Sequence, residues 1–517
     1  MQSGIASQNN KRIAKNTIAL YIRTISSMLV SLYTSRVVLR ELGESDFGIY
    51  NVVGGLVVLF SFIQGAMSIS TQRFLNIELG RKSLIGFNKV FSMSLICYYI
   101  LGVLVLIFGE TIGLWFFETQ INIPESRYYS AKWAYQLSLL TCIVSIIRIP
   151  YNSSIIAYEK MSFYAYTSVI EGLMKLGVVY LLVLSSIDKL ISYSFLILFV
   201  TIILYVIYRY FCKSKLIGCR FTISWDWKLF KELISFSGWS LFGSAANVSA
   251  SQGINIIMNL FCGVIVNASM GIANQVSNAI NTFVTNFQTA FVPQIMKSYA
   301  GDDKEYFLLL INRTSRYSYL LLFIIGAPII ICCDPILHLW LVNPPEYSIQ
   351  FTQLMICFYL IDALSGPLWY SVQATGKIRS YQIIVSSFIF LNLPICYIVL
   401  KCGLSPIIVL LCRVIINLSI HLYRILYLEY KIQLNVKEYL RGVMLRIIIV
   451  SIVSIPLLLL LYNFIKPIRI MYVLTYITTS IILIAVIIYI FGIDSYERNL
   501  IKYKLKSIIC KRSVQEQ

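Results

Sequence analysis

The chain has 517 residues, of which 58% are hydrophobic and 13% are charged, and its mean hydropathy is +0.77. A soluble protein carries about a quarter charged residues, so this composition excludes a soluble enzyme or binding domain. The net charge of +20 does not indicate nucleic-acid binding, because most of the 43 Lys and Arg gather in alternate loops and at the termini. That asymmetry is typical of a multi-pass membrane protein.

Apolar runs of about 20 residues recur along the whole chain, as a hydrocarbon core about 30 Å thick requires. We therefore expect an all-α membrane protein with about 14 transmembrane helices. The predicted spans are 17–39, 48–70, 90–112, 131–151, 162–184, 190–211, 239–262, 266–290, 317–342, 349–371, 381–401, 406–428, 442–464 and 470–492. An even number of spans places both termini on one side, which the basic residues near each end predict to be the cytoplasm.

The longest predicted inside loop divides the chain into two halves. Segment 212–238 ends in an amphipathic stretch, DWKLFKELISFSGW, which is typical of a helix lying in the membrane interface. We expect a six-helix lobe at 1–211, this linker at 212–238, a second six-helix lobe at 239–428, and two extra helices with a basic tail at 429–517.

A short repeat relates the two halves. The segment 150-PYNSSIIAYEKMSFY-164 matches 367-PLWYSVQATGKIRSY-381 at constant offset, and 48-GIYN-51 matches 271-GIAN-274. Both copies of each pair fall at equivalent places in their halves. Six spans per half predict parallel lobes related by an axis along the membrane normal, with a central cavity and alternating access.

Amide side chains line one face of two adjacent spans. A side chain that both donates and accepts hydrogen bonds suits a hydroxyl-rich ligand, whereas the alternative is hydrogen bonding between helices. The stripe on the eighth span is Asn267, Asn274, Asn278, Asn281 and Gln288, and that on the seventh is Gln252, Asn255 and Asn259.

Ionisable residues inside spans are candidates for function because burying charge in a membrane is costly. On the first span, Arg23 and Arg36 either face a cavity or extend to the membrane surface. On the fifth span, Glu171 and Lys175 are four residues apart and can pair, which leaves a structural pair and an ion-coupling role both open. Asp362 on the tenth span is a further candidate for ion coupling, and Arg413 on the twelfth for substrate binding.

Catalytic and metal-binding motifs are missing from the sequence. It contains no GxSxG, Walker A or HExxH pattern, no CxxC, and only two His. We therefore expect no catalytic residue, no metal site and no cofactor, and any energy for transport would come from an H⁺, Na⁺ or substrate gradient.

The run NTIALYIRTISSMLVSLYTSRVVLRELGESDFGIYNVV, the segment ISTQRFLNIELGRK and the paired Pro–Ala–Lys segments together resemble the polysaccharide flippases of the multidrug/oligosaccharidyl-lipid/polysaccharide exporter superfamily. The resemblance implies two V-shaped lobes that flip an undecaprenyl-diphosphate-linked oligosaccharide, as used for O-antigen or lipopolysaccharide, across the bacterial inner membrane. It implies that Arg23 receives the diphosphate, and that the last two spans form a groove for the lipid tail. The partners would be the lipid-linked oligosaccharide, membrane lipids and other polysaccharide-assembly proteins, with no nucleic acid.

Two alternatives remain open at the level of sequence. Ion-coupled multidrug exporters of the same superfamily usually carry acids on spans one, seven or eight, and this chain has none there. A membrane-embedded glycosyltransferase or polymerase would need a long outward loop with catalytic charges, which the sequence also lacks.

Overall fold

A computed structural model describes residues 61–120, 125–184, 188–223, 225–301, 303–341, 343–494 and 497–499, together with scattered positions between Thr17 and Tyr50. Arg36, most of the first predicted span and the tail from residue 500 lie outside the described residues. Every regular element in the described part is helical. Ten of these helices are long and apolar enough to cross a membrane, which confirms the predicted all-α membrane fold.

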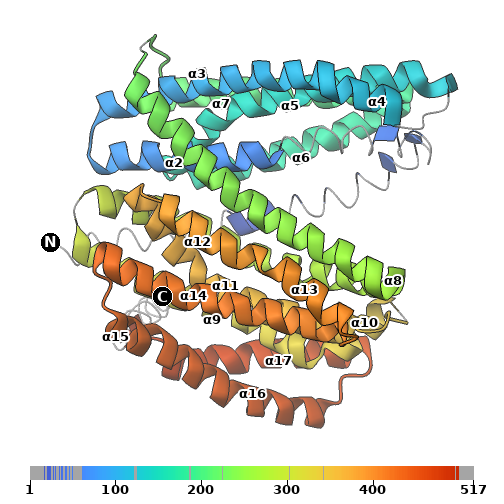
Figure 1. Cartoon of the computed structure of the whole chain (residues 1–517), viewed down its shortest axis with the longest axis vertical. Helices are drawn as coiled ribbons and strands as arrows, with labels where there is room; N and C mark the ends of the chain where they lie inside the picture. The colour runs from blue at the N-terminus through green and yellow to red at the C-terminus, as the bar shows by residue number, and fades with distance from the viewer. Residues whose placement is uncertain are drawn as a thin grey trace, which may run out of the picture. The chain divides into compact units, whose positions relative to one another are not determined.

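The first half is a set of long helices joined by short turns (Figure 1). Its described elements are α2 (Ser61–Gly80), α3 (Leu84–Phe108), η1 (Gly109–Gly113), α4 (Leu114–Gln120), η2 (Glu125–Arg127), α5 (Tyr128–Ala157), α6 (Met161–Leu184) and α7 (Lys189–Lys215). Helix α5 packs against α2, α3 and α7, and α6 packs against α7. Aromatic and aliphatic side chains of these helices share one buried cluster, which includes Phe87, Phe91, Tyr151, Ile155 and Tyr208.

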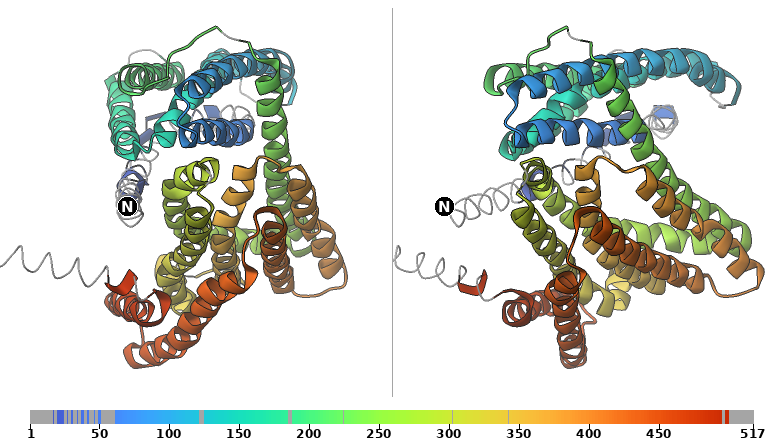
Figure 2. Two further views of the ribbon diagram at one scale, coloured as in Figure 1. Left: turned by 90° about the vertical axis from the view of Figure 1, so that its left-hand side faces the viewer. Right: turned by 60° about the vertical axis from the view of Figure 1, so that its left-hand side comes forward.

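The second half repeats this helical pattern and adds a C-terminal extension. Its elements are α8 (Trp227–Ala300), α9 (Lys304–Ile331), α10 (Cys333–Leu341), α11 (Ser348–Thr375), α12 (Arg379–Phe390), α13 (Asn392–Lys401), α14 (Pro406–Ile432), α15 (Val436–Tyr439), η3 (Leu440–Met444), α16 (Leu445–Ile465), α17 (Ile470–Ile487) and η4 (Ile488–Gly492). Helices α16 and α17, at the red end of the colour scale, lie side by side (Figure 2). Each predicted span from the third onward is therefore helical.

Helix α8 is a single helical run that covers both predicted spans 239–262 and 266–290, without the predicted interruption. Its two parts pack against different helices of unit 2. The first part packs along α13, where Gly253 faces the Leu393 side chain and the Phe261 ring contacts the Tyr397 ring. The second part packs along α11 and the turn before it. There the Ser269 hydroxyl donates a hydrogen bond to the Glu346 carbonyl, and the Tyr359 hydroxyl donates one to the Asn278 side chain. Since a three-residue turn joins α11 to α12, these helices form an antiparallel hairpin.

The chain divides into two compact units. Unit 1 comprises Met1–Val248, Thr289–Phe307 and Tyr370–Ser386, and unit 2 comprises Ser249–Gln288, Leu308–Trp369 and Ser387–Gln517. Unit 1 therefore contains the first half together with one end of α8 and the turn between α11 and α12.

The repeated segments occupy corresponding positions in their helices. Pro150 lies near the end of α5 and Pro367 near the end of α11, and each is followed by a turn and a new helix. Within those turns, Glu159 and Gly376 stand at the same repeat position, and both have positive φ, of 58° and 76°. Only glycine adopts this conformation without strain, so Glu159 holds it against its backbone preference.

Candidate functional site

The two ends of unit 1 collect alternate loops of the chain. One end, here called the outer end, brings together Glu41, Asp46, Arg127 and Asp188, which come from three different connections. The other, called the inner end, brings together the turns after α2, α5 and α7. Asn88, for example, donates to the carbonyls of Gly218 and Arg220. This alternation of loops between two ends is what an up-and-down bundle requires, and the names of the two ends follow the predicted orientation.

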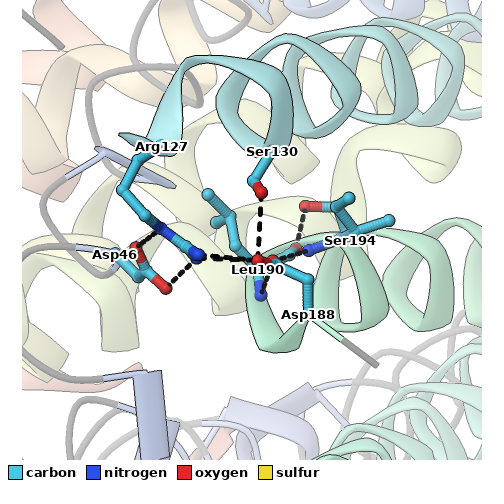
Figure 3. A network of polar contacts seen from close by, with 7 residues as sticks. Asp46, Arg127, Ser130, Asp188, Leu190 and Ser194 are labelled. Carbon is cyan, nitrogen blue, oxygen red and sulfur yellow. Dashed lines mark hydrogen bonds and ion pairs between the residues drawn. The ribbon is translucent and has the colours of Figure 1, made fainter. Parts of the chain in front are cut away.

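At the outer end, Arg127 binds two carboxylates at once (Figure 3). Its guanidinium donates to both oxygens of Asp46 and lies 2.6 Å from Asp188, which also accepts from Ser130 at 3.0 Å. Partial burial acts to raise the pKa of Asp188, but the Arg127 and backbone hydrogen bonds outweigh it and hold this pKa below its usual 3.8. The same carboxylate caps α7, so the cluster fastens the outer ends of three helices.

At the inner end, Glu159 forms an ion pair with Lys297 of α8. The distance is 2.6 Å, and Gln294 donates to the same carboxylate at 2.7 Å. The Glu159 side chain is only 6% exposed and that of Lys297 24%. The positive φ of Glu159 therefore accompanies a specific contact, since this turn residue binds a helix 138 positions away.

The second copy of the repeat makes a matching contact in the same unit. Arg73 of α2 donates to the carbonyl of Gln373 at 2.5 Å and to that of Ala374 at 3.4 Å. Its guanidinium lies over the rings of Phe74 and Phe236, at 4.7 and 4.9 Å. A Cβ at Gly376 would lie 2.1 Å from Arg73 Nη2, so glycine is needed there. Together, Glu159–Lys297 and Arg73–Gln373 are called the inner latch.

Helix α6 carries a polar face that extends from this latch into the predicted span. Tyr164, Thr167, Glu171 and Lys175 are spaced by three and four residues and therefore share one face. Arg23 lies over the Tyr164 ring at 4.7 Å, and the predicted Glu171–Lys175 pair forms at 2.7 Å.

A second arginine, Arg148 of α5, contacts Tyr208 of α7, whose hydroxyl lies 3.0 Å from the Thr167 hydroxyl of α6. Its guanidinium is 5.3 Å from the centre of the Tyr208 ring. Arg148 was not among the predicted site residues. Its position as an arginine within the apolar run 137-LSLLTCIVSIIRIPY-151 marks it as a candidate for function.

The amide stripe of α8 is split between two roles in unit 2. Gln288 is buried and donates to the carbonyl of Ala363 at 3.0 Å, so it connects helices. Asn278 is exposed and accepts from Tyr359 at 2.6 Å, whereas Asn274 and Asn281 are half-buried. Asn255 is half-buried as well, and its side-chain oxygen has no hydrogen-bond partner. The side chains of Asn259 and Asn267 lie outside the described residues.

The remaining predicted charges of unit 2 gather on α11 and α14. Arg413 lies over the Phe358 ring at 4.6 Å and contacts the sulfur of Met355 at 3.6 Å. Asp362 interacts electrostatically with Arg413 and Arg424. The two predicted residues are therefore neighbours. No group of His, Cys, Asp and Glu able to hold a metal ion occurs in the part of the chain that the structure describes.

A cluster of charged side chains joins the C-terminal extension to the rest of unit 2. Arg316 of α9 is 3% exposed and binds Glu497 at 2.7 Å and Asp494 at 3.2 Å. Arg313 also binds Glu497, and Arg446 binds Asp494. Neither Arg313 nor Arg316 was among the residues predicted to form a site.

Comparison of structures identifies the fold, whereas comparison of sequences finds no match. No protein-family model matches the chain, and no curated protein matches it in sequence. Solved structures match over 82% of this chain and 96% of theirs. They include an outward-facing multidrug resistance MATE family transporter of the MOP superfamily (TM-score 0.71, 13% identity), MATE in complex with MaL6 (0.69, 14%) and a MOP superfamily transporter from Pyrococcus furiosus (0.70, 14%). The chain therefore has the fold of the MATE transporters of this superfamily.

Proposed function

We propose that the chain flips an undecaprenyl-diphosphate-linked oligosaccharide across the bacterial inner membrane by alternating access, for surface polysaccharide or lipopolysaccharide synthesis. Both termini would lie in the cytoplasm. The proposal combines the MATE-type fold with the sequence resemblance to polysaccharide flippases, and it treats the protein as a transporter rather than an enzyme.

The observation that carries the proposal is the excess of positive charge within the described spans. In unit 1, Arg23, Arg148 and Lys175 accompany one acid, Glu171, which Lys175 already binds at 2.7 Å. Unpaired cations in a medium of low dielectric are costly, so they are best explained by an anionic ligand. A diphosphate is such a ligand, because arginine binds phosphate oxygens with two parallel hydrogen bonds.

Unit 2 supports the same interpretation with its own residues. Arg413 is a further cation within a predicted span, and the exposed amide of Asn278 offers hydrogen bonds to sugar hydroxyls. Coupling to H⁺ or Na⁺ would involve Asp362 or Glu171, and we propose no other cofactor.

The inner latch supports alternating access. It closes the inner end of unit 1 with one ion pair and one guanidinium–carbonyl contact. Each contact consists of only one or two polar interactions. Both would break when the protein opens to the cytoplasm, where the lipid-linked sugar is made.

Replacing Arg23 tests the proposal in cells that depend on the chain for surface glycan. Arg23→Ala should abolish surface glycan and accumulate lipid-linked precursor, with normal protein in the membrane. Arg23→Lys should retain part of the activity, because it keeps the charge but loses the two-pronged geometry. Full surface glycan with Arg23→Ala would refute the role of Arg23.

A multidrug exporter is the second candidate, and the MATE-type fold itself favours it. An exporter of cationic drugs needs an accessible acid, whereas Glu171 is paired and Asp362 lies beside arginines. Drug-susceptibility assays separate the two functions. Increased drug resistance on expression, with no change in surface glycan, would support the exporter.

A further inference from the structure

Two guanidinium groups in unit 1 lie on tyrosine rings and bind no carboxylate among the described residues. Arg23 lies over Tyr164 and Arg148 over Tyr208, at 4.7 and 5.3 Å. A guanidinium attracted to an aromatic ring still carries N–H donors that can bind a ligand. Both cations are thus held in place and still able to bind.

The two tyrosines belong to one small cluster. The Thr167 hydroxyl is 3.0 Å from the Tyr208 hydroxyl and 3.1 Å from the Tyr164 carbonyl. Thr167 is 2% exposed and Tyr208 4%, so packing fixes this connection. Arg23 of the first span therefore contacts Tyr164 of α6. Arg148 of α5 contacts Tyr208 of α7, whose hydroxyl meets Thr167 of α6.

The charges of this cluster do not balance. Glu171, the next acid along α6, is bound by Lys175 and so cannot neutralise either arginine. The cluster therefore carries two positive charges in excess. A ligand with two adjacent anionic groups would neutralise both, whereas a ligand with one would leave a cation unpaired in the membrane.

We infer that Arg148 and Arg23 together form a binding site for a diphosphate, each arginine taking one phosphate group. Arg148 is the new element of this site, which rests on the proposed function and specifies its substrate chemistry. Tyr164 and Tyr208 act as supports that keep the two guanidinium groups apart and turned toward the ligand. The site selects diphosphate over monophosphate because only a diphosphate engages both arginines.

Binding of two short prenyl probes to the purified full-length protein tests this site. Calorimetry with farnesyl diphosphate and farnesyl phosphate measures the preference directly. Wild type should bind the diphosphate more tightly. Arg148→Ala should weaken diphosphate binding roughly tenfold to a hundredfold, as expected for a charge-assisted hydrogen bond, and should bind both probes alike. Arg148→Gln provides a second variant of similar volume should the alanine variant fail to fold.

A matched control removes an exposed cation from α7, the helix that carries Tyr208. Lys213→Ala should leave both affinities unchanged, because Lys213 points to solvent. If Arg148→Ala kept the wild-type preference for diphosphate, Arg148 would not belong to the site, while the flippase proposal would stand on the Arg23 glycan assay. If wild type showed no preference for diphosphate, the paired-arginine site would be wrong, and the glycan assay would decide separately whether the chain transports.

Discussion

The Glu159–Lys297 ion pair should control how often the inner end of the protein is open. Under alternating access this pair exists only when the inner end is closed. Lys297→Gln removes the cation and leaves the Glu159 carboxylate, which is 6% exposed, without its charged partner. The variant should therefore favour the inward-open state.

The size of the effect follows from burial. Removing one partner of a fully buried pair costs about 3–5 kcal/mol. Because the Lys297 side chain is 24% exposed and Gln294 still donates to the carboxylate, we expect about 2–3 kcal/mol. This corresponds to a roughly 30- to 150-fold change in the ratio of closed to open protein.

Distances between two spin labels at the inner end of unit 1 measure this ratio. Ile85 and Lys377 are exposed positions for the labels. Lys297→Gln should shift the distance distribution toward longer separations, and the charge-swapped double variant Glu159→Lys/Lys297→Glu should restore the wild-type distribution. The matched control Lys89→Gln removes an exposed lysine and should change nothing. An unchanged distribution in Lys297→Gln would refute the latch.

Three further outcomes are expected. Arg127→Ala leaves two partly buried carboxylates unpaired, which should lower the free energy of unfolding by about 2 kcal/mol and the Tm by a few degrees in a thermal-shift assay. An unchanged Tm would show that Arg127 does not hold the outer helix ends together. In a protein freed of competing native Cys, Asn278→Cys should react with a water-soluble thiol reagent, whereas Ser277→Cys, at a fully buried position, should not. Equal labelling of both would argue that the amide stripe only packs helices. Arg316→Met should expose the segment after Gly492 to limited proteolysis, because the buried arginine that binds Glu497 is lost; wild-type digestion would show that this contact does not hold the segment.

Features that depend on neighbouring residues in the sequence could be predicted. Hydropathy located the described helices, and the four-residue spacing of Glu171 and Lys175 predicted their ion pair, which forms. The repeat around Pro150 and Pro367 predicted equivalent positions, and both segments lie at helix ends.

Contacts between distant residues could not be predicted in the same way. Arg73 and Lys297 were not among the predicted site residues, yet both lie in helices and bind turns 300 and 138 residues away. The partner of Arg73 is a backbone carbonyl, which any residue type provides, so no sequence pattern marks it. Arg148 was missed because its neighbour Tyr208 is uncharged, and a search for opposite charges does not find it.

The predicted break in α8 shows the limit of hydropathy at helix ends. Residues 263–265 were expected to separate two spans, yet they lie within helix α8. Within the predicted span 317–342, by contrast, α9 ends at Ile331 and α10 begins at Cys333. Pro335 supplies a local signal there, whereas residues 263–265 contain no proline.

Translocation by the purified protein in liposomes tests the central claim most directly. A fluorescent oligosaccharide linked to a polyprenyl diphosphate would be placed in both leaflets, and an impermeant reagent would quench only the outer leaflet. With wild type, the protected fraction should fall as lipid from the inner leaflet reaches the outside, and Arg23→Ala should keep it at the level of protein-free liposomes. Equal protection with wild type, Arg23→Ala and empty liposomes would contradict a flippase.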